Sequence, residues 1–335
     1  MKQSHVGVLG EGAWGTAVAT LLAENGYEVR LWCYDPAVAQ MVQQERMNTR
    51  YLPGILLDHK IQPTTDLREA ICGARWVFQA TPVQYLRAVL QRTIICFSSE
   101  QIWVVLSKGI EQKTLMLPGQ ILDDVFGCTV QKAVLAGPSF AADLARKQPT
   151  AVTLAATDIE VGRELQVVLA NSYFRPYLSR DLEGVQVGGA LKNIFALGVG
   201  ILDGAGFGDN AQAFLLTRGL REMEGFALAF GGRKETMCGL SGVGDLVMTA
   251  MGEQSRNRAV GRRLGRGESL TTILQTLGHV PEGINTVQSV YQLVQKKNIP
   301  APLCTGIYRI VFENKSITHF LQECMLQPLE CEDVL

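Results

Sequence analysis

The stretch GVLGEGAWGTAVATLLAENGYEVRLWCYD, residues 7–35, decides the fold of the N-terminal half of the chain. An apolar run, His5 to Leu9, predicts a buried strand that leads directly into a glycine-rich turn. Trp14 to Glu24 has the composition of a helix, and Gly26 is a credible C-terminal cap for it. A second apolar run, Glu28 to Trp32, predicts the next strand. This order of elements indicates a parallel sheet covered by helices.

The turn contains Gly10, Gly12 and Gly15 in the spacing G-x-G-x-x-G. The first glycine permits the tight turn, the second lets the backbone approach a pyrophosphate, and the third lets the helix pack on the strand. The spacing alone has little weight in a chain with 34 glycines. Its position between a strand and a helix has more weight, and predicts a dinucleotide-binding turn.

The end of the second strand bears on the choice between NAD and NADP. Asp35 lies about 20 residues beyond the last glycine, where an acid can bind a ribose hydroxyl and repel a 2′-phosphate. Asp35 is equally well placed to cap a helix that begins at Pro36. Residues 31–35 include no arginine to bind a 2′-phosphate, which favours NAD.

The first half of the chain continues this alternation of strands and helices. Further strands are predicted at Trp76–Thr81, Ile102–Leu106, Ala133–Ala136 and Ala151–Ala155. After about residue 183 the pattern becomes helical, with helices expected at Glu183–Ile201, Asn210–Phe230, Arg256–Leu264, Leu270–Thr276 and Thr286–Lys296. The predicted fold is an α/β N-terminal Rossmann-type domain with a mostly parallel sheet, followed by an all-α C-terminal domain. The expected division is a dinucleotide-binding domain at 1–182 and a helical substrate-binding domain at 183–335.

Composition narrows the class of protein. The chain has 335 residues, 47% of them hydrophobic and 19% charged, with a net charge of −1, as in soluble globular proteins that have no strong attraction to nucleic acid. The eight cysteines form no C-x-x-C pair, so we expect reduced thiols in a cytoplasmic protein, without a disulfide framework or a metal site. No secretory signal fits before residue 6. Lys192 and Asn193 interrupt the longest apolar stretch, so we expect no membrane insertion.

That apolar stretch, VQVGGALKNIFALGVGILDG at residues 185–204, places Lys192 where burial is costly unless the charge is paired. Gly188 and Gly189 lie on the same helical face, and we expect them to leave a cavity beside the ammonium group. The alternative is that these glycines let two helices approach closely while Lys192 reaches solvent.

Other polar residues stand in apolar or helix-starting segments. Asp245 lies in the apolar segment GLSGVGDLVMTA, and Ser255-Arg256-Asn257 begins a predicted helix. A hydroxyl, a guanidinium, an amide and free helix amides can together bind a phosphate, although the same residues can simply cap a helix above a solvated basic face. Lys108 follows a strand at the predicted cofactor edge. No histidine lies in these segments, so we expect lysine to transfer the proton.

The motifs GEGAWGTAVA, LWCYDP, SKGIE, AGPSFAADLA, GVQVGGALKNIFALGVG, GLSGVGDL, QSRNR and VPEG occur in this order. Together they resemble the soluble NAD(P)-dependent glycerol-3-phosphate dehydrogenases, most closely the bacterial branch, over nearly the whole chain. The resemblance implies interconversion of dihydroxyacetone phosphate and sn-glycerol 3-phosphate with NADH or NADPH, for phospholipid synthesis. It also implies a homodimer.

The resemblance assigns roles to particular residues. It makes Lys192 the proton donor and acceptor, with Asp245 as its partner. The implied substrate contacts are Lys108, Gly137, Ser139, Lys192, Asp245, Ser255, Arg256 and Asn257. The implied cofactor contacts are Gly10, Gly12, Ala13, Trp14, Gly15, Tyr34, Lys108, Ala141, Arg256, Val280 and Glu282. For proton transfer we expect burial and Lys108 to lower the pKa of Lys192 toward about 7.5, with Asp245 opposing the shift.

The sequence departs from the family pattern at two places. Glu11 stands where relatives usually have a small residue, and an acid beside a pyrophosphate turn should repel it unless the side chain points to solvent. Cys33 and Tyr34 replace a His or Arg often found there, so a preference for NADPH cannot be carried over.

Two alternatives stay open: a related dehydrogenase of β-hydroxy acids, and a redox sensor that binds NADH without chemistry. Ser255-Arg256-Asn257 favours a phosphate over a lone carboxylate, and a sensor would not need a cavity-facing lysine with an acidic partner.

Overall fold

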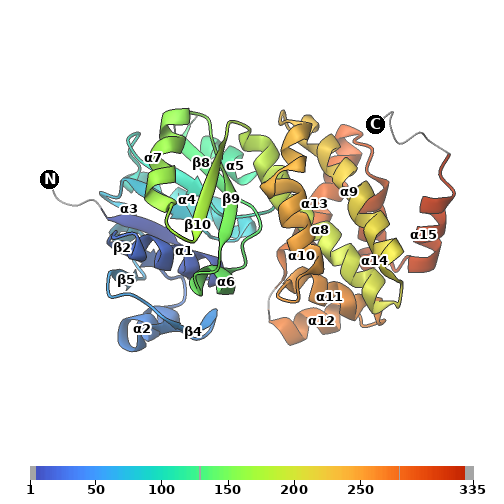
Figure 1. Cartoon of the computed structure of the whole chain (residues 1–335), viewed down its shortest axis with the longest axis horizontal. Coiled ribbons are helices and arrows are strands. Elements are labelled where there is room, and N and C mark those ends of the chain that lie inside the picture. The colour runs from blue at the N-terminus through green and yellow to red at the C-terminus, as the bar shows by residue number, and fades with distance from the viewer. Residues whose placement is uncertain (1–4, 128–129, 279, 329–335) are drawn as a thin grey trace.

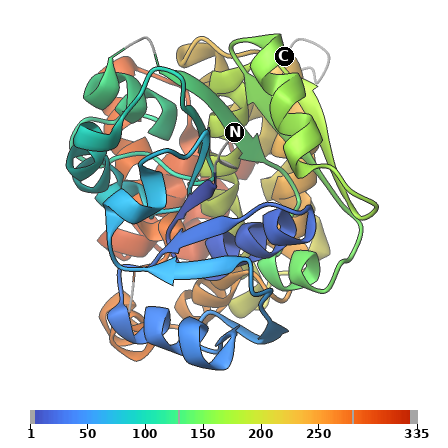
Figure 2. The same ribbon diagram turned by 90° about the vertical axis from the view of Figure 1, so that its left-hand side faces the viewer.

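The computed structural model describes residues 5–127, 130–278 and 280–328. A sheet covered by helices occupies one end of the molecule and a bundle of helices the other (Figure 1). Turning the molecule by 90° brings the sheet domain in front of the helical one (Figure 2). The expected fold class, an α/β domain followed by an all-α domain, is confirmed, because every described element from Leu182 onward is helical.

The central sheet has eight strands in the order β10-β9-β8-β7-β6-β1-β2-β5. Their bounds are β1 Val6–Leu9, β2 Val29–Trp32, β5 Ile61–Thr64, β6 Trp76–Gln79, β7 Ile102–Val105, β8 Gln131–Ala136, β9 Thr150–Ala156 and β10 Phe174–Ser179. All neighbours are parallel except β8 and β9. The short strands β3 (Met47–Asn48) and β4 (Leu52–Leu56) form a separate antiparallel pair.

The two edge strands of this sheet, β5 and β10, are not among the strands predicted from the sequence. Each contains a proline, Pro63 in β5 and Pro176 in β10. Proline lacks the N–H that a central strand must donate, so it argues against a strand in a sequence pattern. At an edge one side of the backbone has no partner strand, and the missing donor costs little.

Alternate residues of each strand face two different helical layers. Val8 and Val104 lie in one core, and Leu9 and Val105 in the other. Near-continuous apolar strands are typical of a parallel sheet buried on both faces. The helices of this domain are α1 Ala13–Glu24, α2 Pro36–Glu45, α3 Leu67–Ile71, α4 Val83–Thr93, η1 Ile94–Cys96, α5 Pro118–Phe126, α6 Ala141–Ala145 and α7 Ile159–Leu169.

The helical domain is built around α8 (Leu182–Gly204), in which all residues from Gly184 to Leu202 are buried. By length and composition α8 could cross a membrane, but its apolar window is entirely buried inside the protein, so it is a core helix. The surrounding elements are α9 Asp209–Ala229, η2 Lys234–Cys238, η3 Leu240–Gly244, α10 Asp245–Met251, α11 Arg256–Gly265, α12 Leu270–Leu277, α13 Glu282–Lys297, α14 Pro302–Glu313 and α15 Ile317–Met325.

Glycines bring α8 and α11 into backbone contact. A Cβ added at Gly261 would lie 2.1 Å from the carbonyl oxygen of Leu197, and one added at Gly200 would lie 2.2 Å from that of Arg258. Backbone atoms of two packed helices cannot move aside for a methyl group. The close approach therefore depends on these glycines.

We expect Gly261→Ala to lower the melting temperature by ~5–10 °C, because overpacking of this size costs roughly 3 kcal/mol. Gly225→Ala in α9 is the matched control, because a Cβ there would meet no atom within 4 Å. The control should be neutral or slightly stabilising, since alanine favours helix. Thermal unfolding followed by circular dichroism measures both variants, and equal melting temperatures would contradict the packing argument.

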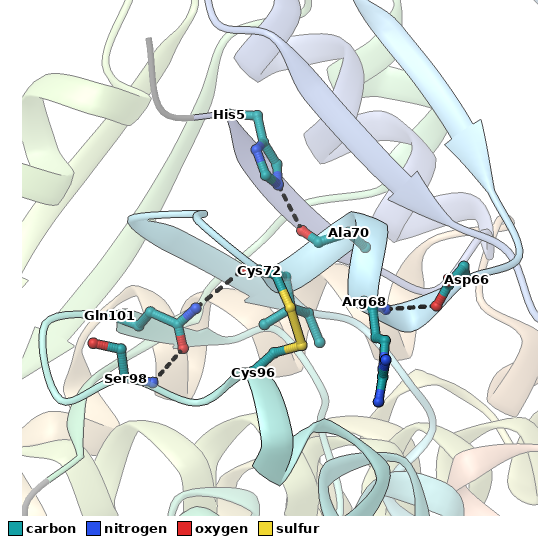
Figure 3. Close-up of a disulfide and its surroundings, with 9 residues drawn as sticks. His5, Asp66, Arg68, Ala70, Cys72, Cys96, Ser98 and Gln101 are labelled. Carbon is teal, nitrogen blue, oxygen red and sulfur yellow. Dashed lines mark hydrogen bonds between the residues drawn. A yellow bond between two sulfur atoms is a disulfide. The ribbon is translucent and has the colours of Figure 1, made fainter. Parts of the chain in front are cut away.

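The structure corrects the expectation that all cysteines are reduced thiols. Cys72, which ends α3, and Cys96, in η1, form a disulfide with their Cα atoms 5.0 Å apart (Figure 3). They are 24 residues apart in the sequence, and only the packing of α3 beside η1 makes them neighbours. The free cysteines are Cys33, Cys238, Cys304 and Cys324, while Cys128 and Cys331 lie outside the described residues.

Candidate active site

The glycine turn after β1 has the geometry that the spacing predicts. Gly10 has φ +117°, a backbone conformation that side chains rarely adopt, and a Cβ on Gly15 would lie 2.0 Å from the carbonyl oxygen of Gly10. A Cβ on Gly12 would meet no heavy atom within 4 Å, so the space beside it is open. Among the described residues, no side chain caps the N-terminus of α1, which follows Gly12. Open space in front of an uncapped helix N-terminus fits a pyrophosphate.

The other predicted cofactor residues lie on both sides of this turn. Ala13 and Trp14 begin α1, and the buried Nε1 of Trp14 has no hydrogen-bond partner among the described residues. Ala141 begins α6, and Tyr34 follows β2 with 76% of its surface exposed. Val280 comes from the helical domain and is 46% exposed.

Glu282 brings the helical domain to the edge of the sheet. It is the first residue of α13, and its Oε2 would lie 3.0 Å from a Cβ placed on Gly109. Burial raises the pKa of Glu282 to about 7, although the Val83 amide and Arg256 oppose the shift. Oε2 of Glu282 is buried without a hydrogen-bond partner in the described structure. This unsatisfied carboxyl group is the kind of feature that a bound ligand would satisfy.

Lys108, Lys192 and Asp245 form the charged centre of the site. The Asp245 carboxylate is fully buried, and its Oδ2 accepts a hydrogen bond from Lys108 Nζ at 2.7 Å. Its Oδ1 accepts from Lys192 Nζ. The Lys192 side chain is 7% exposed, whereas the Lys108 side chain is 18% exposed. The structure brings together the three residues that the sequence suggested, Lys192 with Asp245 as its partner and Lys108 from the other domain.

The pKa of Lys192 in this cluster is shifted in the direction expected from the sequence. Burial lowers the pKa of Lys192 to about 7, Asp245 opposes the shift, and Lys108 adds to it. Burial alone would raise the pKa of Asp245, but the two ammonium groups outweigh it and hold that pKa below its ordinary value. Asp245 therefore stays ionised, while Lys192 has access to both protonation states near neutral pH.

Thr249 is a member of the cluster that sequence analysis missed. Its Oγ1 accepts a hydrogen bond from Lys192 Nζ at 2.9 Å and lies 3.3 Å from Asp245 Oδ1. Thr249 follows Asp245 by four residues in α10, which places both side chains on one helical face. That spacing is the signal that could have identified it.

The glycines beside Lys192 do not both line a cavity, which corrects the expectation from sequence. A Cβ on Gly188 would lie 2.3 Å from the carbonyl oxygen of Ser241, so Gly188 serves close packing of α8 against η3. A Cβ on Gly189 would lie 3.4 Å from Cγ of Lys108. Gly189 thus accommodates the Lys108 side chain.

Lys108 also contacts the turn after β8. Its Nζ lies 3.4 Å from the carbonyl oxygen of Gly137, which also accepts a hydrogen bond from Ser139 Oγ at 2.9 Å. Lys108 follows β7 and Gly137 follows the parallel neighbour β8, so both stand at the carboxyl edge of the sheet, as the glycine turn does. Ligands of open α/β sheets bind at this edge.

The segment Ser255-Arg256-Asn257 is more constrained than the sequence interpretation supposed. Ser255 caps α11, with its Oγ accepting from the Arg258 amide at 3.2 Å. Asn257 donates to Asn193 Oδ1 at 2.8 Å and accepts from the Gly283 amide at 3.1 Å. Arg256 is exposed. The capping alternative therefore holds for Ser255, and Asn193 links α8 to α11.

Glu11 is turned toward β2, not toward solvent. It is 7% exposed, and its two carboxylate oxygens accept from the backbone amides of Tyr34 and Asp35 at 3.1 Å each. Neither outcome foreseen from sequence, repulsion at the turn or exposure to solvent, describes this arrangement. Asp35 caps α2, because its side chain accepts from the Ala37 amide.

An open glycine turn and a buried lysine–carboxylate cluster, both at the carboxyl edge of one sheet, define a class: two-domain dehydrogenases in which a lysine serves the reacting centre. Comparison with known proteins makes the assignment more specific. Models of the N-terminal and C-terminal parts of NAD-dependent glycerol-3-phosphate dehydrogenase match residues 5–162 and 181–322. The chain belongs to this family of NAD(P)-dependent oxidoreductases, and the resemblance stated from sequence is confirmed.

Curated relatives and a solved structure agree with this assignment. A glycerol-3-phosphate dehydrogenase (NAD(P)+) of Citrifermentans bemidjiense is 40% identical over 98% of this chain and 99% of its own. One from Nitratidesulfovibrio vulgaris is 41% identical with the same coverage of each chain. The crystal structure of glycerol-3-phosphate dehydrogenase from Coxiella burnetii superposes with a TM-score of 0.93 at 35% identity, covering 97% of this chain and 99% of that one.

Proposed function

We propose that the protein interconverts dihydroxyacetone phosphate and sn-glycerol 3-phosphate with NADH or NADPH, and that Lys192 is the proton donor and acceptor. The observation that carries this proposal is the buried cluster of Lys108, Asp245 and Lys192, in which Lys192 has a pKa of about 7. A general acid works best when its pKa lies near the working pH.

When bound, the reduced nicotinamide supplies the hydride for the ketone carbon. Lys192 stabilises the negative charge that develops on the ketone oxygen and then transfers its proton to that oxygen. Asp245 holds the Lys192 ammonium in position through Oδ1 and Lys108 through Oδ2. Lys108, the more exposed of the two lysines, stands where it can also contact the substrate. In the reverse direction neutral Lys192 accepts the proton of the alcohol.

The remaining predicted residues complete the proposed site. We assign the substrate phosphate to the carboxyl edge of the sheet and the start of α11, where a guanidinium and helix amides favour an anion. The proposed substrate residues are Lys108, Gly137, Ser139, Lys192, Asp245, Ser255, Arg256 and Asn257. The proposed cofactor residues are Gly10, Gly12, Ala13, Trp14, Gly15, Tyr34, Lys108, Ala141, Arg256, Val280 and Glu282. Asn257 already makes two of the hydrogen bonds that its amide can form, so part of its contribution is to position Arg256 and the start of α13.

Four further features belong to the same proposal. We place the division between the dinucleotide-binding domain, 1–182, and the helical domain, 183–335, because β10 ends at Ser179 and α8 begins at Leu182. A homodimer and a cytoplasmic location, with supply of phospholipid synthesis, follow from the family alone. Light scattering of the purified protein measures the oligomeric state.

A direct assay tests the function against its two alternatives. Protein, NADH and dihydroxyacetone phosphate are mixed and NADH absorbance is followed, and the assay is repeated with a β-keto acid. Steady loss with dihydroxyacetone phosphate alone is the expected result. Turnover of the keto acid alone would support a hydroxy-acid dehydrogenase. Binding of NADH without turnover of either substrate would support a redox sensor.

The pH dependence of the two reaction directions should be opposite. Reduction needs protonated Lys192, so kcat/KM for dihydroxyacetone phosphate should fall as the pH rises through about 7, the pKa of Lys192. Oxidation needs neutral Lys192, so kcat/KM for glycerol 3-phosphate should rise over the same range. Titration of the substrate's phosphate would change kcat/KM in the same sense for reduction and for oxidation. Profiles of kcat/KM against pH that run parallel in the two directions would contradict the role of Lys192.

A further inference from the structure

The carboxylate of Glu11 links the cofactor turn to the end of β2. Its two oxygens accept from the Tyr34 and Asp35 amides at 3.1 Å each. The backbone of Glu11 is also held, because its carbonyl oxygen accepts from Thr16 Oγ1 at 2.9 Å and from Asn48 Nδ2 at 2.8 Å. Hydrogen bonds to the backbone and to the carboxylate of Glu11 therefore fix the position of this residue.

The backbone donors that follow β2 are all occupied. The Cys33 amide donates to the carbonyl oxygen of Thr64, and the Tyr34 and Asp35 amides donate to Glu11. Position 36 is a proline and has no N–H. The next three amides, of residues 37–39, donate to the side chain or carbonyl oxygen of Asp35. An anion that arrives at this turn finds no free backbone N–H to bind.

The charges at this turn are predominantly negative. The Glu11 carboxylate accepts from the Asp35 amide, so residue 35 brings a second carboxylate to this turn, and Arg50 forms an ion pair with that second carboxylate. The Arg50 guanidinium is already paired with Asp35 Oδ2 and lies 5.3 Å from the centre of the Tyr51 ring. The nearby thiol of Cys33 stays neutral, because burial, Glu11 and Asp35 raise its pKa to about 12. Two carboxylates thus lie at this turn, and the Arg50 guanidinium is already paired with one of them.

We infer that Glu11 is a specificity-determining residue that makes the site select NADH over NADPH. In dinucleotide-binding folds the adenosine ribose binds at the end of β2. A ribose 2′-hydroxyl can donate a hydrogen bond to a carboxylate there. A 2′-phosphate brings negative charge to the same place, meets both carboxylates, and has no backbone amide to bind. The inference rests on the proposed use of a nicotinamide dinucleotide, and it narrows that cofactor to NADH.

Binding measurements on two pairs of ligands test the inference without turnover. The first pair is NADH and NADPH, titrated into the protein by calorimetry. The second is adenosine 5′-monophosphate and adenosine 2′,5′-bisphosphate, which differ only by the 2′-phosphate. We expect the wild-type protein to bind the member without the 2′-phosphate about 100-fold more tightly in each pair.

Glu11→Gln and Glu11→Ala separate charge from hydrogen bonding. Glutamine keeps an acceptor for one amide and removes the charge, so the preference should fall by about tenfold. Alanine also frees the Tyr34 and Asp35 amides, so it should reduce the preference further. Glu28→Gln is the matched control, because Glu28 is exposed and precedes the same strand at its opposite end. The control removes the same charge and should leave the preference unchanged.

Two outcomes would overturn the inference. One is equal affinity of the wild-type protein for the two members of a pair, which needs no variant and so does not depend on variants that fold. The other is a folded Glu11→Gln protein with the wild-type preference. If neither NADH nor NADPH bound at all, the proposed cofactor class would fail, and the selectivity inference would fail with it. Binding of NADH with equally tight binding of NADPH overturns only the selectivity.

Discussion

Lys192→Ala lowers kcat in both directions by at least ~1000-fold, because it removes both the proton donor and the positive charge at the reacting oxygen. Steady-state kinetics measure this loss of kcat. Calorimetric titration measures the affinity for NADH, which should change less than about twofold. NADH binding should be spared because Lys192 lies on α8 of the helical domain, whereas the glycine turn follows β1 in the sheet domain.

The variant should fold, because Asp245 does not lose both of the cations that neutralise its buried charge. Lys108 still donates to Oδ2 of Asp245, so the buried carboxylate keeps one cation. Lys132→Ala is the control, since Lys132 is also ion-paired with an aspartate, Asp123, but lies away from the site. The control should keep nearly full activity. A Lys192→Ala protein with more than about a tenth of wild-type kcat would show that Lys192 is not the acid.

Most of the fold could be predicted because its signals are local. The strand, glycine turn and helix at residues 5–24 lie within one short segment, and the observed elements β1 and α1 begin and end within one residue of those predicted. The edge strands β5 and β10 could not be found in this way, because Pro63 and Pro176 disguise them. The Cys72–Cys96 pair could not be found either, since it depends on how α3 packs beside η1.

The site was predictable where an unusual residue had to be explained. A lysine in an apolar helix and an aspartate in an apolar segment each need a partner, and the structure pairs Lys192 with Asp245. Gly188 misled the sequence interpretation, because a glycine that makes room for backbone and one that makes room for a ligand look the same in sequence. The hydrogen bonds of Glu11 were not predictable, since they depend on how closely the turn after β1 approaches the end of β2.

Asp245→Ala should be strongly destabilising as well as inactive. The change leaves the ammonium groups of Lys108 and Lys192 close together in a buried site without their shared counter-charge. Loss of one partner from a buried ion pair typically costs about 3–5 kcal/mol. Asp123→Ala is the matched control, because it removes the aspartate of a more exposed pair, with Lys132, and should cost about 1 kcal/mol or less. Denaturant unfolding followed by fluorescence measures both.

The cause of the loss has two signatures that a simple cavity would not have. Adding Lys192→Met to Asp245→Ala replaces a buried amine that has lost its counter-charge with an apolar side chain of similar length, so the double variant should be more stable than Asp245→Ala alone. The second signature is the pH dependence. Burial and Lys108 lower the pKa of Lys192, and Asp245 raises it, so removal of Asp245 lowers that pKa below its wild-type value of about 7.

The sign of the pH effect follows from these two pKa values. Between the pKa of Lys192 in the variant and about 7, the folded variant has released a proton that the folded wild-type protein still binds. Over that range the stability of the variant rises with pH relative to wild type. The deficit should therefore be larger at about pH 5 than at about pH 8. A deficit that is independent of pH, together with additive losses in the double variant, would mean that Asp245 serves only to fill space.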